Sequence, residues 1–242
     1  MGTATGRDIG MKQGQTIEEL QAKDEGVVVI FSGGMDSTAL LYKCREEFAH
    51  VRAVSFDYGQ RHRKELLFAA RSCAALEIPH AVIDLSSIAP FLPGNALTGD
   101  VEVPHGHYAA PTMKRTVVPN RNAIMLSVAC GIAAANGAET AAMGVHAGDH
   151  PIYPDCREEF IRAFEEMERL SLDGISAMRV YTPFIQSSKA DIARIGEELG
   201  VPWRQTWSCY EGGDIHCGRC GTCVERREAF QLAGIVDPTD YV

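Results

Sequence analysis

The chain has 242 residues, of which 45% are hydrophobic and 23% charged, and its formal net charge is −9. This length accommodates one α/β domain with a sizeable core. The acidic balance argues against a polynucleotide-binding surface, because phosphate contacts require basic residues. No apolar run approaches the ~20 residues of a membrane span, and the N-terminus lacks the apolar core of a secretion signal. We therefore expect a cytoplasmic protein that acts on a small molecule, with no nucleic-acid or membrane partner. The sequence leaves a homodimer open.

Residues 1–26 carry Gly, Thr, Gln and charged side chains with little apolar periodicity, and we expect a flexible extension there. The pattern changes at residues 27–31, a continuous apolar run typical of a strand buried on both faces. Further strand patterns follow at residues 51–57, 81–85, 140–144 and 180–184. Helical patterns separate them: one with Leu40, Leu41 and Cys44 on one side, then residues 65–76, 122–136 and 157–170, and a helix from the capping box Ser188–Asp191 to about residue 199.

This alternation of strands and helices predicts an α/β fold with a doubly wound, five-stranded parallel sheet. Residues 86–118, after the third strand, hold four prolines and several glycines, and we expect a long loop or lid.

The most informative segment is Ser32-Gly33-Gly34-Met35-Asp36-Ser37-Thr38, between the first strand and its helix. Two glycines let a phosphate approach the backbone, and the start of the helix offers unpaired N–H groups. Hydroxyls come from Ser32, Ser37 and Thr38. A Walker A loop is excluded because no lysine follows the last glycine. The pattern instead resembles the PP-loop of ATP pyrophosphatases, which implies cleavage of ATP between its α and β phosphates. An ordinary glycine-rich turn is the simpler alternative.

This loop lacks a cation, so the charge of a departing pyrophosphate has to be neutralised by Mg²⁺ and by side chains from elsewhere. Lys189 is the leading candidate, because it begins a capped helix after the fifth strand. A solvated lysine at a helix start is the alternative. Asp36 is either a Mg²⁺ ligand or a helix cap, and the sequence does not separate the two.

Four cysteines near the C-terminus have the spacing C-x7-C-x2-C-x2-C: Cys209, Cys217, Cys220 and Cys223. Four thiolates form a closed tetrahedral Zn²⁺ site with no position for water, which predicts one structural zinc ion. An iron–sulfur cluster and a redox pair are the alternatives, and His216 is a neighbouring candidate ligand. Cys44, Cys73 and Cys130 lie on apolar helix faces and are predicted core residues.

Together with these two motifs, four segments resemble the 7-cyano-7-deazaguanine synthase family, also called QueC, from about Val27 to the end of the chain. The segments are Phe-Asp-Tyr-Gly-Gln-Arg-His at 56–62, Val-Pro-Asn-Arg-Asn at 118–122, Tyr-Pro-Asp-Cys-Arg at 153–157 and Thr-Pro-Phe at 182–184. The resemblance implies an adenine nucleotide α-hydrolase-like fold and an ATP-dependent carbon–nitrogen ligase. Such an enzyme converts 7-carboxy-7-deazaguanine and ammonia into the nitrile, preQ0, through an adenylated acid and an adenylated amide, for queuosine and archaeosine biosynthesis.

The resemblance also implies roles for individual residues. ATP would be bound by Phe31, Ser32, Gly33, Gly34, Met35, Asp36, Ser37, Thr38, Ala39, Leu40, Leu41, Asp57 and Arg61. The catalytic set would be Asp36, Ser37, Lys189 and Arg121, and the substrate would contact Tyr58, Asn122, Tyr153, Asp155 and Arg157. The implied cofactors are ATP, Mg²⁺ and one structural Zn²⁺. Asp155 has a helix cap as its alternative role, and the tyrosines have the core.

We thus expect a PP-loop ATP-binding domain over residues 27–200, with a zinc-binding segment over 201–242 packed on it. Asn120 stands where the family more often has glycine, and residues 144–150 form one variant of a changeable segment. Both leave open a relative that stops at the amide or joins the deazaguanine to another amine. The more distant alternatives are a tRNA-thiolating enzyme, disfavoured by the acidic balance, and a non-catalytic nucleotide-binding zinc module.

Overall fold

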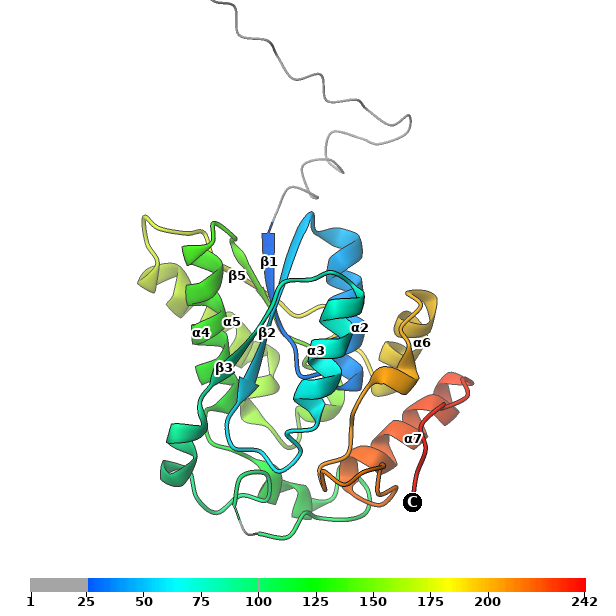
Figure 1. Cartoon of the computed structure of the whole chain (residues 1–242). Coiled ribbons are helices and arrows are strands. Elements are labelled where there is room, and N and C mark those ends of the chain that lie inside the picture. The colour runs from blue at the N-terminus through cyan, green and yellow to red at the C-terminus, as the bar shows by residue number, and fades with distance from the viewer. Residues whose placement is uncertain (1–25, 100) are drawn as a thin grey trace, which may run out of the picture.

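The computed structural model describes residues 26–99 and 101–242, so the predicted extension lies outside the described residues apart from Gly26. Its five strands are β1 (Gly26–Ile30), β2 (His50–Asp57), β3 (His80–Asp84), β4 (Thr140–Ala142) and β5 (Arg179–Tyr181). They form one sheet in the order β3-β2-β1-β4-β5, and every neighbouring pair is parallel (Figure 1). The predicted five-stranded parallel sheet is confirmed. Its strand order reverses between β1 and β4, and ligands of such sheets bind at the carboxyl ends of the strands at this point.

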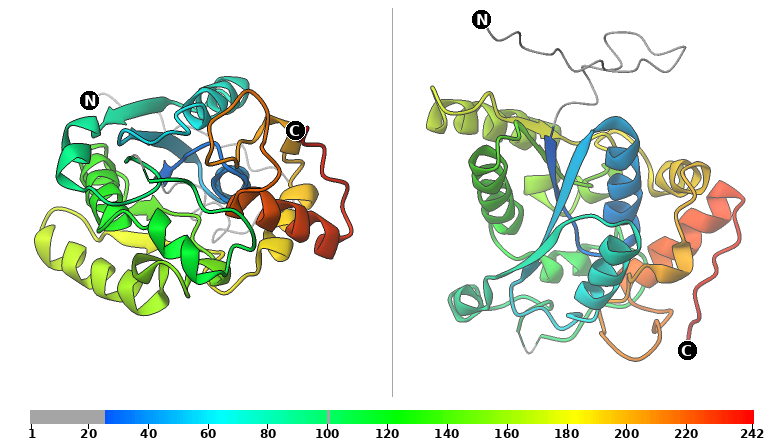
Figure 2. Two further views of the ribbon diagram at one scale, coloured as in Figure 1. Left: turned by 90° about the horizontal axis from the view of Figure 1, so that it is seen from below. Right: turned by 45° about the horizontal axis from the view of Figure 1, so that its top comes forward.

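The helices are α2 (Met35–Glu47), α3 (Glu65–Ala75), α4 (Arg121–Ala135), α5 (Glu158–Ser171), α6 (Lys189–Glu198) and α7 (Gly221–Ala233). In Figures 1 and 2, α4 and α5 cover one face of the sheet, while α2 and α3 cover the other, with α6 and α7 beyond them. The predicted helices lie within one or two residues of the observed ones. Helix α7 was not predicted, because the glycine-flanked cysteines at its start have a metal-ligand spacing that hides its periodicity.

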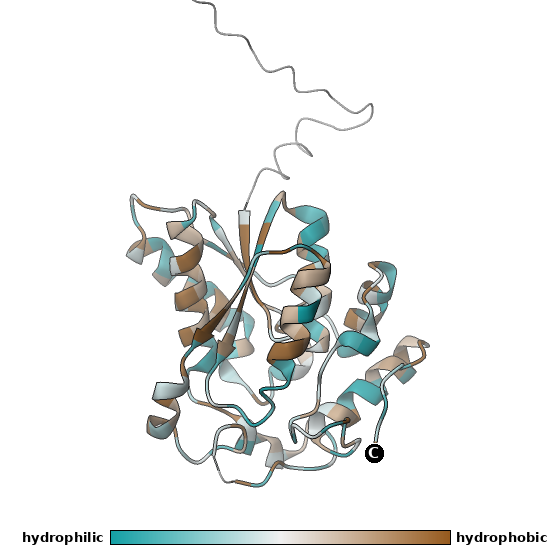
Figure 3. Ribbon diagram, viewed as in Figure 1, coloured by the Kyte–Doolittle hydropathy of each residue, from teal (hydrophilic) through white to brown (hydrophobic). Residues whose placement is uncertain are grey.

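The core has two halves, one on each face of the sheet, and side chains of β1 alternate between them. Val27 and Val29 pack with Leu40, Ile192 and other residues of the α2 and α6 side, whereas Val28 packs with the α4 and α5 side. Figure 3 shows the strands as mainly apolar. The predicted core cysteines are buried in these clusters: Cys44 and Cys73 in one, and Cys130 in the other.

The predicted long loop after β3 contains two short 3₁₀ helices, Ser86–Phe91 and Pro111–Thr116. Its middle pairs with the cysteine-rich segment, through a bridge between His105 and Cys220 and a hydrogen bond from Gly106 N to Arg219 O at 3.0 Å. The loop therefore runs below the carboxyl ends of the strands (Figure 1). Among the helices of residues 26–99 and 101–242, none is long and apolar enough to cross a membrane.

Candidate functional site

The glycine-rich loop joins β1 to α2 and is held in shape by its own hydroxyl groups. Ser32 Oγ lies 3.0 Å from Ser37 Oγ and accepts a hydrogen bond from Gly34 N at 3.2 Å. Thr38 Oγ1 donates to Gly34 O at 2.7 Å. Gly33 has φ +82°, and a Cβ there would lie 2.6 Å from Glu65 O, so only glycine fits between the loop and α3. The loop is thus pressed against the first turn of α3.

The start of α2 is open to a ligand. Gly34 is its N-cap residue, and no side chain of the described residues caps the helix. The first-turn N–H groups therefore have no intrahelical partner, and the residues that carry them line the cavity at the positive end of the helix dipole. Asp36 does not act as the cap, which removes one of the two roles that the sequence left open for it.

Lys189, the first residue of α6, reaches this helix end from the capping box that the sequence predicted. Its Nζ lies 2.6 Å from Asp36 Oδ2, 3.1 Å from Glu225 Oε2 and 3.4 Å from His146 Nε2. The lysine side chain is only 15% exposed, so the alternative of a solvated lysine is wrong. The second carboxylate oxygen of Asp36, Oδ1, is also buried, and it has no hydrogen-bond partner among residues 26–99 and 101–242.

Burial and charge oppose each other in this cluster. Burial raises the pKa of Asp36, but Lys189 and His146 outweigh it and the net pKa is lowered. Burial would lower the pKa of Lys189, yet the carboxylates of Asp36 and Glu225 raise it. Burial raises the pKa of Glu225 in spite of Lys189, which is farther from Glu225 than from Asp36. At neutral pH the Lys189–Asp36 pair is therefore fully charged.

The fully buried His146 follows β4 and completes this cluster. Its Nδ1 accepts a hydrogen bond from Gly148 N at 3.1 Å, so a neutral ring carries its proton on Nε2. Nε2 lies 3.6 Å from Asp149 Oδ2, and Tyr108 donates to Asp149 Oδ1 at 3.0 Å. His146 and Asp149 fall in the segment 144–150 that the sequence marked as a departure, and this was the available signal for them. No sequence signal pointed to Glu225 or Tyr108 as site residues.

Arg121 lies in the same cavity at the start of α4. Its guanidinium is 5.8 Å from the centre of the Tyr58 ring and 5.7 Å from that of Tyr153, within the range of cation–π contact. Burial raises the pKa of Tyr58 to about 12, so its hydroxyl stays neutral beside the cation. Asn120, just before, has φ +56°, a left-handed conformation that asparagine adopts more readily than most residues. This explains why asparagine can replace the expected glycine.

Two further titratable residues that sequence reasoning missed lie in the cavity wall, His62 and Glu65. Glu65 Oε1 accepts from Gln60 Nε2 at 3.0 Å. Burial raises the pKa of Glu65 to about 8 and lowers that of His62 to about 3. The His62 Nε2 to Glu65 Oε1 distance of 3.6 Å exceeds a hydrogen bond, and burial favours both neutral forms, so the two are not a salt bridge. No sequence signal distinguished Glu65 from an ordinary glutamate at a helix start.

The structure brings part of the predicted site together in one cavity at the carboxyl ends of β1, β2 and β4. The predicted residues in its wall are Phe31, Ser32, Gly34, Met35, Asp36, Ser37, Tyr58, Arg121, Asn122, Tyr153 and Lys189. Other predicted contacts face elsewhere. Ala39, Leu40 and Leu41 are core residues. Gly33 and Thr38 support the loop without lining the cavity.

Four predicted side chains bind other parts of the protein. Asp57 accepts from Gly59 N at 3.1 Å and pairs with Arg63. Arg61 donates to Gly99 O from two nitrogens, at 2.6 and 3.1 Å. Asp155 accepts from Asn122 N at 3.1 Å, and so caps α4 and not the helix that follows it in sequence. Arg157 donates to His150 O at 2.9 Å.

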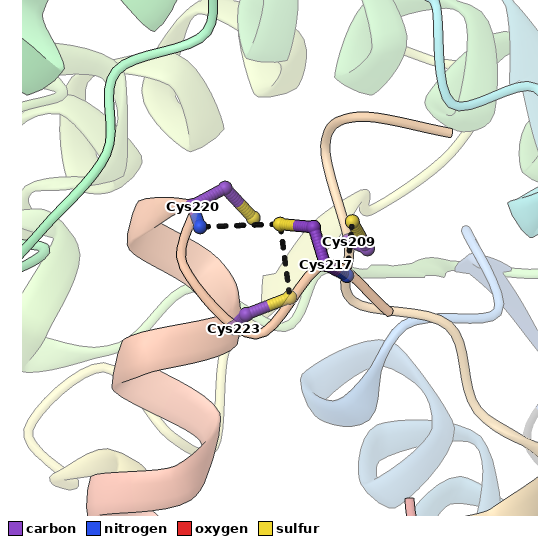
Figure 4. A group of neighbouring side chains, drawn as sticks. All are labelled: Cys209, Cys217, Cys220 and Cys223. Atoms are coloured by element: carbon purple, nitrogen blue, oxygen red, sulfur yellow. Dashed lines mark hydrogen bonds between the residues drawn. The ribbon is translucent and has the colours of Figure 1, made fainter. Parts of the chain in front are cut away.

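The four cysteines of the predicted metal site converge, with all sulfur atoms within 4.8 Å of one another (Figure 4). Four sulfurs around a tetrahedral zinc ion, each ~2.3 Å from it, would be about 3.8 Å apart. The Cys217–Cys223 separation is 4.0 Å, and backbone N–H groups point to two of the sulfurs: Cys217 N to Cys209 Sγ at 3.4 Å and Cys220 N to Cys217 Sγ at 3.2 Å. The residues therefore fit a bound metal ion such as zinc. His216 is turned away, since its Nε2 accepts from Ser208 N at 3.1 Å.

The cysteine-rich segment also forms part of the cavity. Trp207 N donates to Gly33 O at 2.9 Å and so holds the glycine-rich loop directly. Ser208, Tyr210 and Thr222 belong to the cavity wall, and Thr222 Oγ1 donates to Ser208 O at 2.7 Å. A metal bound at the cysteines would thus stabilise one wall of the site.

The sheet order, the loop between β1 and α2, and the four-cysteine cluster define an α/β protein of the PP-loop type. The sequence model of the family "Queuosine biosynthesis protein QueC" matches residues 26–234, and the chain belongs to this family. A 7-cyano-7-deazaguanine synthase from Rhizobium leguminosarum bv. trifolii is 59% identical over 214 residues, with 88% of this chain and 91% of the relative covered. The enzyme of the same name from Ruegeria pomeroyi is 58% identical, with 88% and 93% covered. The predicted resemblance is confirmed.

Proposed function

We propose that the chain is an ATP-dependent carbon–nitrogen ligase that converts 7-carboxy-7-deazaguanine and ammonia into 7-cyano-7-deazaguanine, the product for which its relatives are named. One observation carries this proposal beyond the family name. A single cavity contains both the glycine-rich loop with Lys189 and, in the same wall, Arg121 with two tyrosines. ATP and an anionic heteroaromatic acid can therefore meet there.

The phosphates of ATP bind at the open start of α2, where N–H groups and the hydroxyls of Ser32 and Ser37 are available. Lys189 neutralises negative charge on the departing pyrophosphate, and removing such a charge contact typically slows a reaction by about 10²- to 10³-fold. Two carboxylates, of Asp36 and Glu225, already contact this lysine, so a second cation is needed before a polyphosphate can approach. Asp36 fits a Mg²⁺ ion, because its buried Oδ1 has no hydrogen-bond partner in the described part of the chain and carboxylate oxygens are the usual ligands. When bound, Mg²⁺ would supply charge neutralisation on the phosphates.

Arg121 holds the carboxylate of the substrate, and Tyr58 and Tyr153 flank its ring system. A carboxylate is a poor electrophile, so one of its oxygens first attacks the α-phosphorus of ATP and releases pyrophosphate. Ammonia then adds to the acyl adenylate, AMP leaves with the oxygen, and a proton is lost to give the amide. The enclosed wall keeps water from competing with ammonia at this step.

The amide oxygen attacks a second ATP in the same geometry, since the atom to be activated again lies in line with an α-phosphorus. Loss of AMP and of the amide protons gives the nitrile. We propose one structural zinc ion at the four cysteines, with no part in these steps, because four thiolates leave no open position. We also propose the division into an ATP-binding domain at 27–200 and a zinc-binding segment at 201–242.

The test is to incubate the protein with 7-carboxy-7-deazaguanine, ammonia and ATP and to follow products by mass spectrometry. The expected result is the amide first and the nitrile later, with one AMP released at each step. Accumulation of the amide without nitrile at excess ATP would refute the stated product and favour an enzyme that stops at the amide. AMP formation that does not depend on 7-carboxy-7-deazaguanine would refute the assignment of this acid as the substrate.

A further inference from the structure

Glu65 is a buried carboxyl group in the cavity wall with unused hydrogen-bonding capacity. It is 8% exposed, and Oε1 accepts from Gln60 Nε2, whose amide is itself held by Phe56 O and Tyr58 N. Oε2 has no hydrogen-bond partner among residues 26–99 and 101–242. Nor does any lysine or arginine in those ranges lie within ion-pair distance of this carboxyl group. Burying a carboxyl group in this way is costly unless something binds it.

Arg121 is the matching feature of opposite charge. It lines the same cavity and forms no ion pair with a carboxylate in the described part of the chain, and its charge lowers the pKa of Glu65 against the larger effect of burial. The two residues therefore interact electrostatically across the cavity but do not form an ion pair. A ligand that presents hydrogen-bond donors to Glu65 and hydrogen-bond acceptors or negative charge to Arg121 would satisfy both residues.

We propose, on the basis of the proposed function, that Glu65 accepts hydrogen bonds from the N1–H and 2-amino groups of the deazaguanine, while Arg121 faces its O6 and 7-carboxylate. These four groups follow one another around the bicyclic ring, from the 2-amino group through N1–H and O6 to the 7-carboxylate, as donor, donor, acceptor and anion. A carboxylate and a guanidinium complement them in the same order. The Tyr58 ring packs beside the Arg121 guanidinium, and from this position it would contact the face of the deazaguanine ring.

This assignment differs from the one that the sequence suggested, in which Asp155 was the carboxylate in contact with the substrate. Asp155 is outside the cavity wall and binds Asn122 at the start of α4 through both oxygens, at 3.1 and 3.3 Å. Both oxygens of Asp155 therefore accept hydrogen bonds from within the protein, whereas only Oε1 of Glu65 does so. The specificity residue for the guanine-type edge is therefore Glu65.

The assignment also predicts a proton effect. Free Glu65 has a pKa of about 8, so it is mostly neutral at pH 7, but it accepts two hydrogen bonds only as a carboxylate. Ligand binding then releases close to one proton at pH 7, and affinity rises as the pH is raised toward 8. The groups that face Glu65 are His62 on its own segment, Gln60, and Arg121 from α4, and the first of these is neutral over this range.

The experiment combines Glu65→Gln with a ligand that lacks the 2-amino group. Dissociation constants are measured by calorimetry for 7-carboxy-7-deazaguanine and for its 2-deamino analogue. Wild-type protein should prefer the amino compound by roughly 10- to 100-fold, the usual cost of an unmet hydrogen bond to a charged group. Glu65→Gln keeps the acceptor for Gln60 and is neutral like the free acid, so it should fold, and its preference should fall below about threefold. Buffers of different ionisation enthalpy should report proton release in the wild type only.

Asp155→Asn is the competing variant. Loss of the preference in Asp155→Asn with its retention in Glu65→Gln would overturn the assignment, and so would wild-type binding without proton release at pH 7. A wild-type protein that neither binds nor converts the deazaguanine acid would refute the proposed function itself. A wild type that converts it, with full discrimination retained in Glu65→Gln, would refute only the role of Glu65.

Discussion

His62 and Glu65 should give the protein two opposite dependences of stability on pH, which single variants can separate. His62 is 4% exposed, and burial lowers its pKa from 6.5 to about 3. It stabilises the fold fully above pH 6.5, and this contribution is lost as the pH falls toward 3, because only the unfolded chain takes up the proton. Glu65 behaves in the reverse sense. Its pKa is raised from 4.5 to about 8, so it favours the fold below pH 4.5 and penalises it as the pH rises toward 8.

The magnitudes follow from these pKa values at about 1.36 kcal/mol per unit. Between pH 7 and pH 5 the unfolded imidazole becomes protonated and the folded one does not, so His62 costs about 2 kcal/mol of unfolding free energy. Over the same interval ionisation of Glu65 in the unfolded chain becomes less favourable, while the folded carboxyl group stays neutral, and this returns about 2–3 kcal/mol of unfolding free energy. The two effects nearly cancel in the wild type. Measuring the wild type alone would therefore hide both.

The assay is urea unfolding at pH 7 and pH 5 with zinc present, for the wild type, His62→Gln and Glu65→Gln. On going to pH 5, His62→Gln should gain about 2 kcal/mol relative to the wild type, and Glu65→Gln should lose about 2–3 kcal/mol. Other titrating groups, including the cysteines, are shared by all three proteins and drop out of the comparison. Equal changes in all three would refute the buried, neutral state of these residues at pH 7.

Three further predictions concern the proposed phosphate and metal sites. Lys189→Met should slow both amide and nitrile formation, by about 10²- to 10³-fold, and destabilise the fold by about 3–5 kcal/mol, because it leaves the partly buried carboxylate of Asp36 unpaired. Slowing of one step alone would indicate separate sites. Asp36→Ala and Ser37→Ala should abolish AMP formation while circular dichroism stays native, and near-normal turnover in both would contradict the loop assignment. Elemental analysis should find one zinc ion per chain, and Cys220→Ser should lose it with a lowered Tm; a metal-free protein of unchanged Tm would contradict the site.

The fold could be predicted because its signals are local. The apolar run of β1, the glycine-rich turn and the capping box at Ser188–Asp191 each lie within a few residues, and the structure contains all three. Strand lengths were less accurate. β4 and β5 end two and three residues earlier than predicted, since apolar residues such as Met143 continue beyond the sheet and line the cavity.

The site was only partly predictable, because its charge balance depends on residues far apart in sequence. Lys189 was identified from its helix start, but its partners Glu225 and His146 come from α7 and from the turn after β4. Conversely, Asp57 follows β2 at the expected edge of the sheet, yet its side chain turns to Arg63. Sequence position gives the edge on which a residue lies, whereas the direction of its side chain is decided by packing. The role of Asp57 therefore stays a prediction.

The position of the cysteine cluster explains how a metal without a catalytic role could still control the reaction. Cys220 is the N-cap residue of α7, and Cys223 lies in its first turn, so a metal bound to both fixes the start of this helix. Two residues farther along, Glu225 contacts Lys189, which in turn contacts Asp36 at the phosphate loop. Metal loss would therefore displace a buried carboxylate beside the pyrophosphate position before the sheet is affected. Because that carboxylate helps to set the position and charge of Lys189, zinc removal should reduce turnover at chelator concentrations that leave the cores on both faces of the sheet intact.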